Sequence, residues 1–122
     1  MRHFTFINEE MHAEKVSLKE IARAVGTPCY VYSSTTFERH FNVFKDSVKD
    51  IDALIAYSVK ANSNIGILAT LSKLGAGADV VSGGELQRAL TAGIPANKIV
   101  FSGVGKTKDE IEAAAKAKIK IF

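Results

Sequence analysis

The sequence has one cysteine, two prolines and no tryptophan among its 122 residues, and no apolar run in it is long enough to cross a membrane. Cys29 alone cannot form a disulfide within the chain, which is typical of a protein from a reducing compartment. The first residues, 1–4, are not followed by the apolar stretch of a secretory signal. His3, His12 and His40 are scattered and lack the spacing of metal ligands, so we expect no metal site.

The sequence also has little net charge: 16 Lys and Arg residues against 13 Asp and Glu residues give +3. Much of the excess lies late in the chain, at Lys106, Lys108, Lys116, Lys118 and Lys120. These lysines are not interleaved with aromatic residues, so we interpret them as a solvated helix face and expect no nucleic-acid partner. A hydrophobic content of 47% allows one modest core and excludes a disordered chain.

What the sequence does contain is a regular series of helix starts. Three segments carry Ser or Thr followed three residues later by Glu, which is the capping box that opens a helix: Ser17–Glu20, Thr35–Glu38 and Thr107–Glu110. Gly26 is placed to end the first of these helices. In the second, four apolar residues recur at helical spacing, and we predict that they pack into the core: Phe37, Phe41, Phe44 and Val48.

Short apolar segments alternate with these helices. We predict strands at residues 4–7, 30–32, 53–60, 78–81, 99–102 and 119–122, with further helices at 64–74 and 84–92. Strand–helix alternation with short loops predicts a parallel sheet built of βαβ units, and a closed barrel of such units needs eight strands and about 250 residues. We therefore expect an α/β fold, a partial (β/α)8 barrel with about its first four strands, forming the amino-terminal part of a larger protein.

The most informative segment is the uncharged apolar run at residues 53–59, which is followed by Lys60. Alternation along a strand puts four side chains on one face: Leu54, Ala56, Ser58 and Lys60. The carboxyl ends of parallel strands are where α/β folds place their chemistry, and a partly desolvated lysine there can act as a Schiff-base nucleophile. The alternative is a lysine that only ends the strand and reaches water.

Asp79 is an acidic residue within the next apolar strand. A buried carboxylate is costly unless it is paired, so an amine or a bound cofactor beside it would explain its position. A place at the strand end in contact with water explains it equally well.

Three glycine-containing loops resemble ligand-binding motifs. Residues 75–79 precede their strand, so they cannot be the pyrophosphate loop of a dinucleotide-binding fold. Residues 103–107 contain Gly-Lys-Thr between a strand and a helix, which leaves a nucleotide-binding module using Lys106 and Thr107 as one alternative, although Val100 stands where a P-loop needs glycine. Residues 82–85 open a helix and can either hold an anion or form a tight turn in which Glu85 complements the helix dipole.

Three motifs together resemble one family. Residues 57–62 (Tyr-Ser-Val-Lys-Ala-Asn) are similar to the lysine motif of the fold-type III pyridoxal-phosphate enzymes, the alanine racemase-like barrels. Residues 75–86 resemble the second-strand motif of the decarboxylases in that family, and residues 102–111 resemble their third-strand motif. The order and spacing of the three motifs are those of the family, and the resemblance covers essentially the whole chain.

Within the family, the chain is similar to the diaminopimelate decarboxylases. Asn62 is followed by Ser63-Asn64, as in the decarboxylases, where the racemases usually continue with Ala-Tyr-Gly-His. Residues 12–18 and 26–33 resemble an amino-terminal segment that the ornithine decarboxylases lack. The resemblance implies decarboxylation of meso-2,6-diaminopimelate to L-lysine and carbon dioxide; an ornithine- or arginine-type decarboxylase and a non-catalytic pyridoxal-phosphate carrier are the alternatives.

The resemblance also implies roles and partners. Lys60 would bind pyridoxal 5'-phosphate covalently, Asp79 would orient or charge-balance that lysine, and Ser58 would line the pocket floor. Residues 1–32 would belong with a β-domain outside this sequence, and residues 33–122 would form the first half of the cofactor-binding barrel. The implied protein is a cytoplasmic homodimer with an amino-acid substrate and no membrane partner, and this segment alone would be inactive.

Overall fold

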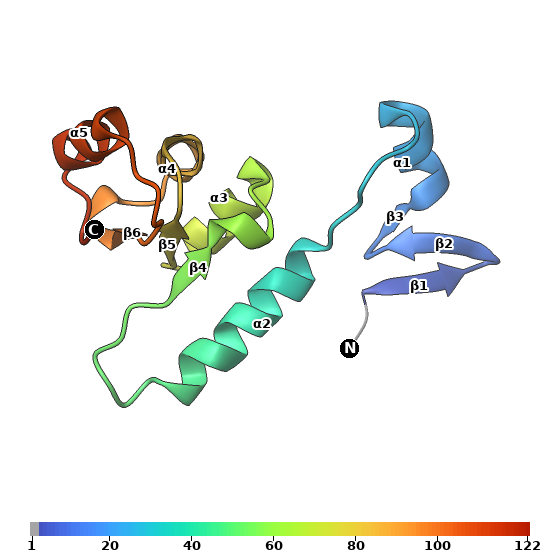
Figure 1. Cartoon of the computed structure of the whole chain (residues 1–122). Helices are drawn as coiled ribbons and strands as arrows, with labels where there is room; N and C mark the ends of the chain where they lie inside the picture. The colour runs from blue at the N-terminus through green and yellow to red at the C-terminus, as the bar shows by residue number, and fades with distance from the viewer. Residues whose placement is uncertain (1–2) are drawn as a thin grey trace.

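The computed structural model describes residues 3–122, which form two parts (Figure 1). Residues 26–33 form an extended linker between them. The first part is a three-stranded antiparallel sheet followed by one helix: β1 (Phe4–Ile7), β2 (Glu10–Ala13), β3 (Val16–Ser17) and α1 (Leu18–Val25). The turn between β1 and β2 uses Asn8 and Glu9 at φ values of 49° and 66°, the left-handed backbone typical of a two-residue hairpin. Strand β1 is confirmed, whereas β2 and β3 were not predicted.

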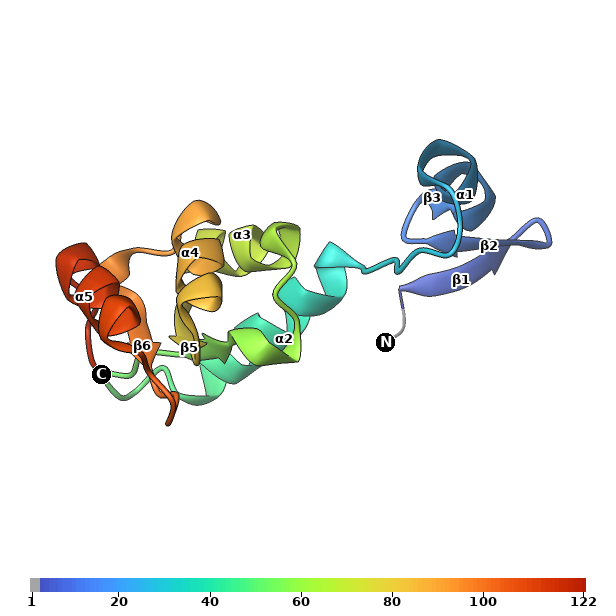
Figure 2. The ribbon, with the colours of Figure 1, turned by 45° about the horizontal axis from the view of Figure 1, so that its top comes forward.

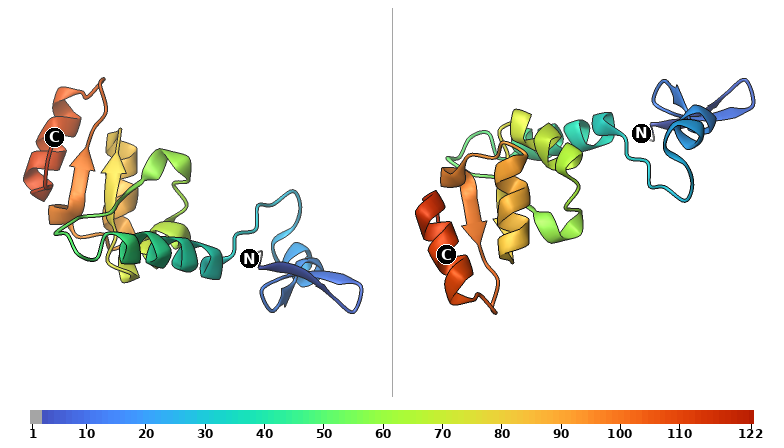
Figure 3. Two further views of the ribbon diagram at one scale, coloured as in Figure 1. Left: turned by 90° about the horizontal axis from the view of Figure 1, so that it is seen from below. Right: turned by 90° about the horizontal axis from the view of Figure 1, so that it is seen from above.

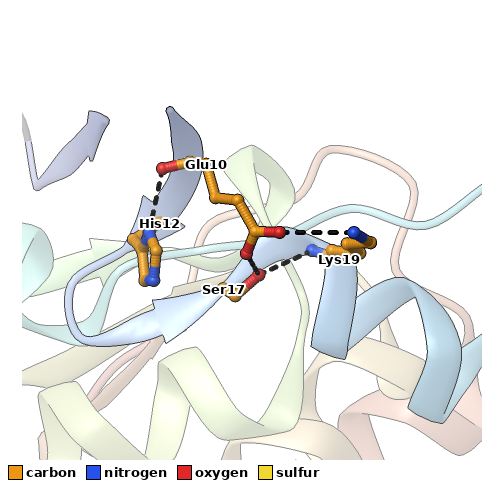
Figure 4. Close-up of polar contacts among 4 residues, drawn as sticks. All are labelled: Glu10, His12, Ser17 and Lys19. Carbon is orange, nitrogen blue, oxygen red and sulfur yellow. Dashed lines mark hydrogen bonds and ion pairs between the residues drawn. The ribbon is translucent and has the colours of Figure 1, made fainter. Parts of the chain in front are cut away.

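Glu10 fixes the start of α1 against the sheet (Figure 4). Its carboxylate accepts hydrogen bonds from the Ser17 hydroxyl at 3.2 Å and from Lys19 Nζ at 3.3 Å. The hydrogen bonds from Lys19 and Ser17 lower the pKa of the Glu10 carboxyl. Ser17 is confirmed as the N-cap, but its hydroxyl accepts from the Lys19 amide and not from Glu20, so the expected capping box is only half formed. Gly26 ends the helix as predicted.

The long helix α2 (Ser34–Ser47) begins earlier than the Thr35–Glu38 pair predicted. Ser33 is its N-cap and accepts from the Thr36 amide, and the Glu14 carboxylate accepts from the Ser33 hydroxyl at 2.7 Å. The start of α2 is therefore set by a residue of the first part of the chain. The strand predicted at residues 30–32 is wrong: this segment makes no sheet ladder, and Tyr30 is 90% exposed.

The second part is a parallel sheet with strand order β4-β5-β6: β4 (Ala56–Ser58), β5 (Gly77–Val80) and β6 (Ile99–Phe101). Three helices follow these strands: α3 (Ile65–Lys73), α4 (Gly83–Thr91) and α5 (Lys108–Ala117). Short 3-10 turns lie at η1 (Val59–Ala61) and η2 (Ala96–Lys98). The βαβ units are confirmed. The segment at 119–122 contributes a single parallel bridge, Val100 to Ile121, in place of the fourth strand predicted.

The two faces of this sheet differ. Helices α3, α4 and α5 cover one face, and α2 packs beside α3 (Figure 2). The covered face holds the larger apolar core, which includes Val59, Val80 and Phe101, all with no exposed surface. The other face carries Ala56, Ser58, Asp79 and Val100, all half-buried, and Figure 3 shows β5 and β6 uncovered from that side. This open face is the one on which the polar residues of the strands lie.

Several sequence predictions need correction in detail. The strand expected at 53–60 is only three residues long, because the chain turns into η1 directly after Ser58. Phe41 is buried and Phe37 packs against the same cluster, but Phe44 is 55% exposed.

None of the helices between residues 3 and 122 has the length and apolar character needed to cross a membrane.

Candidate functional site

Polar side chains lie in a row at the carboxyl edge of the parallel sheet. Ser58 at the end of β4 is in register with Asp79 in β5 and donates its hydroxyl to Asp79 Oδ2 at 3.4 Å. Ser102, the residue after β6, donates its hydroxyl to Asp79 Oδ1. One carboxylate on the central strand thus receives a hydroxyl from each side, and we call these three residues the serine–aspartate row.

Lys60 lies just beyond this row, in η1. The preceding residue, Val59, is fully buried in the core, and the Tyr57 hydroxyl reaches across the turn to the Asn62 carbonyl oxygen at 3.4 Å. Burial raises the pKa of the Tyr57 phenol, so Tyr57 stays a neutral donor over the physiological range. The buried Val59 fixes the backbone before Lys60, and the hydrogen bond to Asn62 fixes the backbone after it. The side chain of Lys60 is exposed.

The chain after Lys60 is held by a relay of asparagines. The Asn62 side-chain oxygen accepts from the Asn64 amide at 3.0 Å, and the Asn64 side-chain oxygen accepts from the Gly66 amide at 2.8 Å. Asn64 is the N-cap of α3, so this relay joins the lysine turn directly to a helix start. Arg88 of α4 also donates to the Ser63 carbonyl oxygen at 3.4 Å.

Two glutamates close the loops after β5 and β6. Glu85 accepts from the Val81 amide at 2.9 Å, so the tight turn expected at residues 82–85 is present. Glu110 accepts from the Gly83 amide at 2.7 Å and from the Thr107 amide at 2.9 Å, which links the starts of α4 and α5. These backbone hydrogen bonds from Thr107 and Gly83 lower the pKa of the Glu110 carboxyl.

The loop at residues 103–107 is not arranged as a phosphate cradle. Lys106 Nζ donates to the Gly103 carbonyl oxygen at 2.7 Å and lies 5.3 Å from the centre of the Phe101 ring. Thr107 forms the full capping box of α5 with Glu110, as predicted. Both residues of the nucleotide-binding alternative are therefore engaged within their own loop.

Sequence reasoning and structure agree on part of this site. Lys60, Asp79 and Ser58 all lie at the carboxyl edge, but Lys60 makes no hydrogen bond or ion pair with any residue in the range 3–122. Of the two alternatives for Lys60, its exposed side chain matches the lysine that ends the strand and reaches water. The partners of Asp79 are hydroxyls and not an amine. Ser102 was missed as a site residue, although its place just after a strand, like that of Lys60, was a usable signal.

The donor set fits one end of pyridoxal phosphate. Lys60 carries an unengaged primary amine on the turn that follows β4, and the Asp79 carboxylate, which lies in register with Ser58 of β4, accepts from two hydroxyls. These groups suit the aldehyde end of that cofactor. The starts of α3, α4 and α5 each already carry a side-chain acceptor, from Asn64, Ser82 and Thr107. The described residues therefore offer groups for the aldehyde end but no helix start free of a side-chain cap for the phosphate.

Comparisons with known proteins point to the same chemistry. Residues 34–122 match the model of the pyridoxal-binding domain of pyridoxal-dependent decarboxylases. A diaminopimelate decarboxylase of Vibrio cholerae is 51% identical over 123 residues, which cover 100% of this chain and 30% of that protein. The crystal structure of a diaminopimelate decarboxylase from M. jannaschii superposes with a TM-score of 0.88 at 36% identity, covering 97% of this chain and 29% of that one.

A second structure of the M. jannaschii enzyme was determined in complex with L-lysine, and it matches with a TM-score of 0.83 at 37% identity, over 96% of this chain and 28% of that one. The chain thus spans about 30% of the length of the curated relatives it matches. With a family model matched over residues 34–122, the chain belongs to the pyridoxal-dependent decarboxylase family, and it corresponds to the amino-terminal part of its diaminopimelate decarboxylases.

Proposed function

We propose that this chain is the amino-terminal part of an enzyme that uses pyridoxal phosphate to decarboxylate meso-2,6-diaminopimelate to L-lysine and carbon dioxide. The observation that carries the proposal is the unengaged amine of Lys60, held on a fixed turn beside the serine–aspartate row. The names of the relatives and the lysine-bound relative support the choice of substrate. An ornithine- or arginine-type decarboxylase remains the alternative to be tested.

The finer fold belongs to the same proposal. Residues 33–122 form the first half of a (β/α)8 barrel, whose interior would be the sheet face that carries Ala56, Ser58 and Asp79. Support comes from the strand order and from the helices, which cover only the opposite face. Residues 1–32 associate with a β-domain of the complete enzyme, and exposed apolar side chains such as Phe6 on the first sheet support that assignment.

The roles of the residues follow from their chemistry. Pyridoxal phosphate, when bound, supplies an electron sink for the charge that remains when carbon dioxide leaves the substrate. Lys60 would hold the aldehyde end through its amine, and the turn between Val59 and Asn62 would keep that amine at the mouth of the barrel. The Asp79 carboxylate accepts from two hydroxyls, and in the completed site it would orient Lys60 or balance its positive charge.

The complete enzyme acts as a homodimer on a small amino-acid substrate, and the 122-residue chain alone has no decarboxylase activity. The physical reason is that Lys60 is exposed and the sheet face beside it is uncovered, so water is not excluded from the reacting groups. Catalysis therefore requires these residues to be joined to the rest of the fold. We call the protein used in the experiments below the completed enzyme. It consists of this chain followed by the remaining part of the enzyme, which is encoded either by the same gene or by the gene of the Vibrio cholerae relative.

The decisive experiment is borohydride reduction of the completed enzyme after loading with pyridoxal phosphate. We expect a mass gain of one pyridoxyl group on the peptide that contains Lys60. In Lys60→Ala, both this label and lysine formation from meso-diaminopimelate should be lost, with activity falling at least about 1000-fold because the amine that holds the cofactor is gone. The matched control is Lys116→Ala, which removes an exposed lysine on α5.

Two results would contradict the proposal. Labelling that is spread over surface lysines and unchanged in Lys60→Ala would remove Lys60 from the site. Release of carbon dioxide from ornithine or arginine but not from meso-diaminopimelate would keep the chemistry and replace the substrate. Equal losses in Lys60→Ala and Lys116→Ala would indicate a general effect on folding.

A further inference from the structure

Asp79 is the central member of the serine–aspartate row, and its two oxygens are engaged separately. Ser58 of β4 donates to Oδ2, and Ser102, after β6, donates to Oδ1. An ionised carboxylate has about four acceptor positions, two on each oxygen, so each oxygen retains one position for a further donor. The two hydroxyls therefore fix the orientation of the carboxylate without using up its capacity to accept.

Ser102 is itself held in place by the backbone around it. Its amide donates to the Val80 carbonyl oxygen at 3.0 Å, which continues the sheet spacing one residue beyond β6. The next residue, Gly103, lies so close to β5 that a Cβ atom there would be 2.5 Å from the Val81 carbonyl oxygen. The contact between Glu110 and the Gly83 amide ties the two loops together further along. The Ser102 hydroxyl is thus presented to Asp79 from a fixed position.

We propose that Ser102 is a positioning residue for the decarboxylation site: its hydroxyl orients the Asp79 carboxylate, which leaves a free acceptor position on each Asp79 oxygen for the amine of Lys60 or of the substrate. This inference rests on the proposed function and adds a residue to it. Ser58 donates to the other oxygen at 3.4 Å, which is longer than a usual bond between a hydroxyl and an oxygen, so we expect the Ser58 hydroxyl to have the smaller effect.

The test compares Ser102→Ala, Ser102→Thr and Ser58→Ala in the completed enzyme. The control is Ser47→Ala, which removes a hydroxyl at the end of α2 that bonds only to the Phe44 carbonyl oxygen. We expect Ser102→Ala to lower kcat about 10-fold with little change in KM, since misorientation of a group near the reacting atoms affects the chemical step most. Ser102→Thr, which keeps the hydroxyl, should recover most of that loss, and Ser58→Ala should lose less.

A second readout does not depend on turnover. The dissociation constant of pyridoxal phosphate is measured by titrating the apo form of each variant and following the visible absorbance. We expect Ser102→Ala to raise this dissociation constant severalfold. Its melting temperature should be the same as that of Ser47→Ala. A residue with only a structural role would lower the melting temperature and leave the cofactor affinity of the folded fraction unchanged.

Distinct outcomes separate this inference from the proposed function. If the unmodified completed enzyme traps no cofactor on Lys60, the proposed function fails and the inference fails with it. If it traps the cofactor but Ser102→Ala behaves as Ser47→Ala in both kcat and cofactor affinity, the inference alone is overturned. If Ser102→Thr keeps the hydroxyl and still loses as much kcat and cofactor affinity as Ser102→Ala, the hydroxyl does not account for the loss, and the inference is overturned as well.

Discussion

At the scale of single residues, Glu110 joins two helices that are separate in sequence. One carboxylate oxygen accepts from the Gly83 amide at the start of α4, and the other accepts from Thr107, the N-cap of α5. Both interactions satisfy amides that a helix start otherwise leaves without a partner. A negative charge at two helix starts is also favourable with respect to their dipoles. This one side chain therefore keeps the loops after β5 and β6 at a fixed separation.

Stability should depend on the ionisation of Glu110. The pKa of this carboxyl lies below its ordinary value of 4.5 in the folded chain, so its contribution is fully present above that value. The contribution is lost as pH falls through the lowered pKa, because the carboxyl is then protonated in the folded chain as well as in the unfolded chain. We expect Glu110→Gln to destabilise the chain at pH 7 and to flatten the fall in stability as the pH is lowered through 4.5 and below.

The measurement is urea unfolding followed by circular dichroism across that pH range. The matched control is Glu38→Gln, an exposed residue of α2 that contacts neither helix start. Glu10 and Glu14 also have lowered pKa values, through hydrogen bonds to their own neighbours, so some acid dependence should persist in the Glu110 variant. Identical pH slopes for wild type and Glu110→Gln would show that the carboxylate does not link the helices in solution.

At the scale of elements, a glycine lies where two strands of the parallel sheet approach each other closely. Gly77 opens β5, and a Cβ atom there would overlap the Lys98 carbonyl oxygen and lie 3.2 Å from Leu54 Cδ1. The oxygen belongs to the backbone just before β6, so it cannot move without shifting a strand. A side chain at Gly77 would therefore separate β5 from β6 at their amino ends.

Gly77→Ala should destabilise the parallel sheet by about 1–3 kcal/mol, the usual cost of overpacking a close contact. The control is Gly105→Ala, where nothing lies within 4 Å of the added Cβ and the change should be close to neutral. Chemical denaturation of both variants under one set of conditions gives the difference. A Gly77→Ala variant as stable as Gly105→Ala would mean that the two strands are not held at the observed spacing.

At the scale of the whole molecule, large apolar side chains are exposed in both parts of the chain. In the first part and the linker, Phe6 is 70%, Val25 68% and Tyr30 90% exposed. In the second part, Val43 is 58% and Ile51 64% exposed, and β4 is an edge strand of the parallel sheet. Uncovered apolar surface and unpaired strand edges favour association with other chains.

We therefore expect the purified 122-residue chain to associate as its concentration rises. Light scattering coupled to size-exclusion chromatography measures this directly, and the same samples assayed with meso-diaminopimelate should release no carbon dioxide. A chain that stays monomeric over the whole concentration range would show that its apolar surface is covered by a rearrangement absent from this structure. Turnover by the same material would contradict the requirement for the remaining fold.

The sequence by itself determined the helix starts at Ser17 and Thr107 and the alternation of strands and helices. It also placed Lys60 at the carboxyl end of one strand segment and Asp79 in the next. These features depend on interactions between residues within about four positions of each other or on the period of a regular element, and local patterns record both. The family resemblance, which rested on three such local motifs, is confirmed by the match of residues 34–122.

Tertiary structure alone decided the rest. Ser33, and not Thr35, begins α2 because the Glu14 carboxylate reaches it from the first part of the chain, and Ser102 joins the site because β6 lies beside β5. The first contact joins residues that are 19 positions apart in the sequence, and the second joins residues that are 23 positions apart. A pattern within a short segment does not record which distant residue a strand or a helix start will contact. Which side chains surround Asp79 is therefore set by strand order, and strand order is a property of the folded sheet.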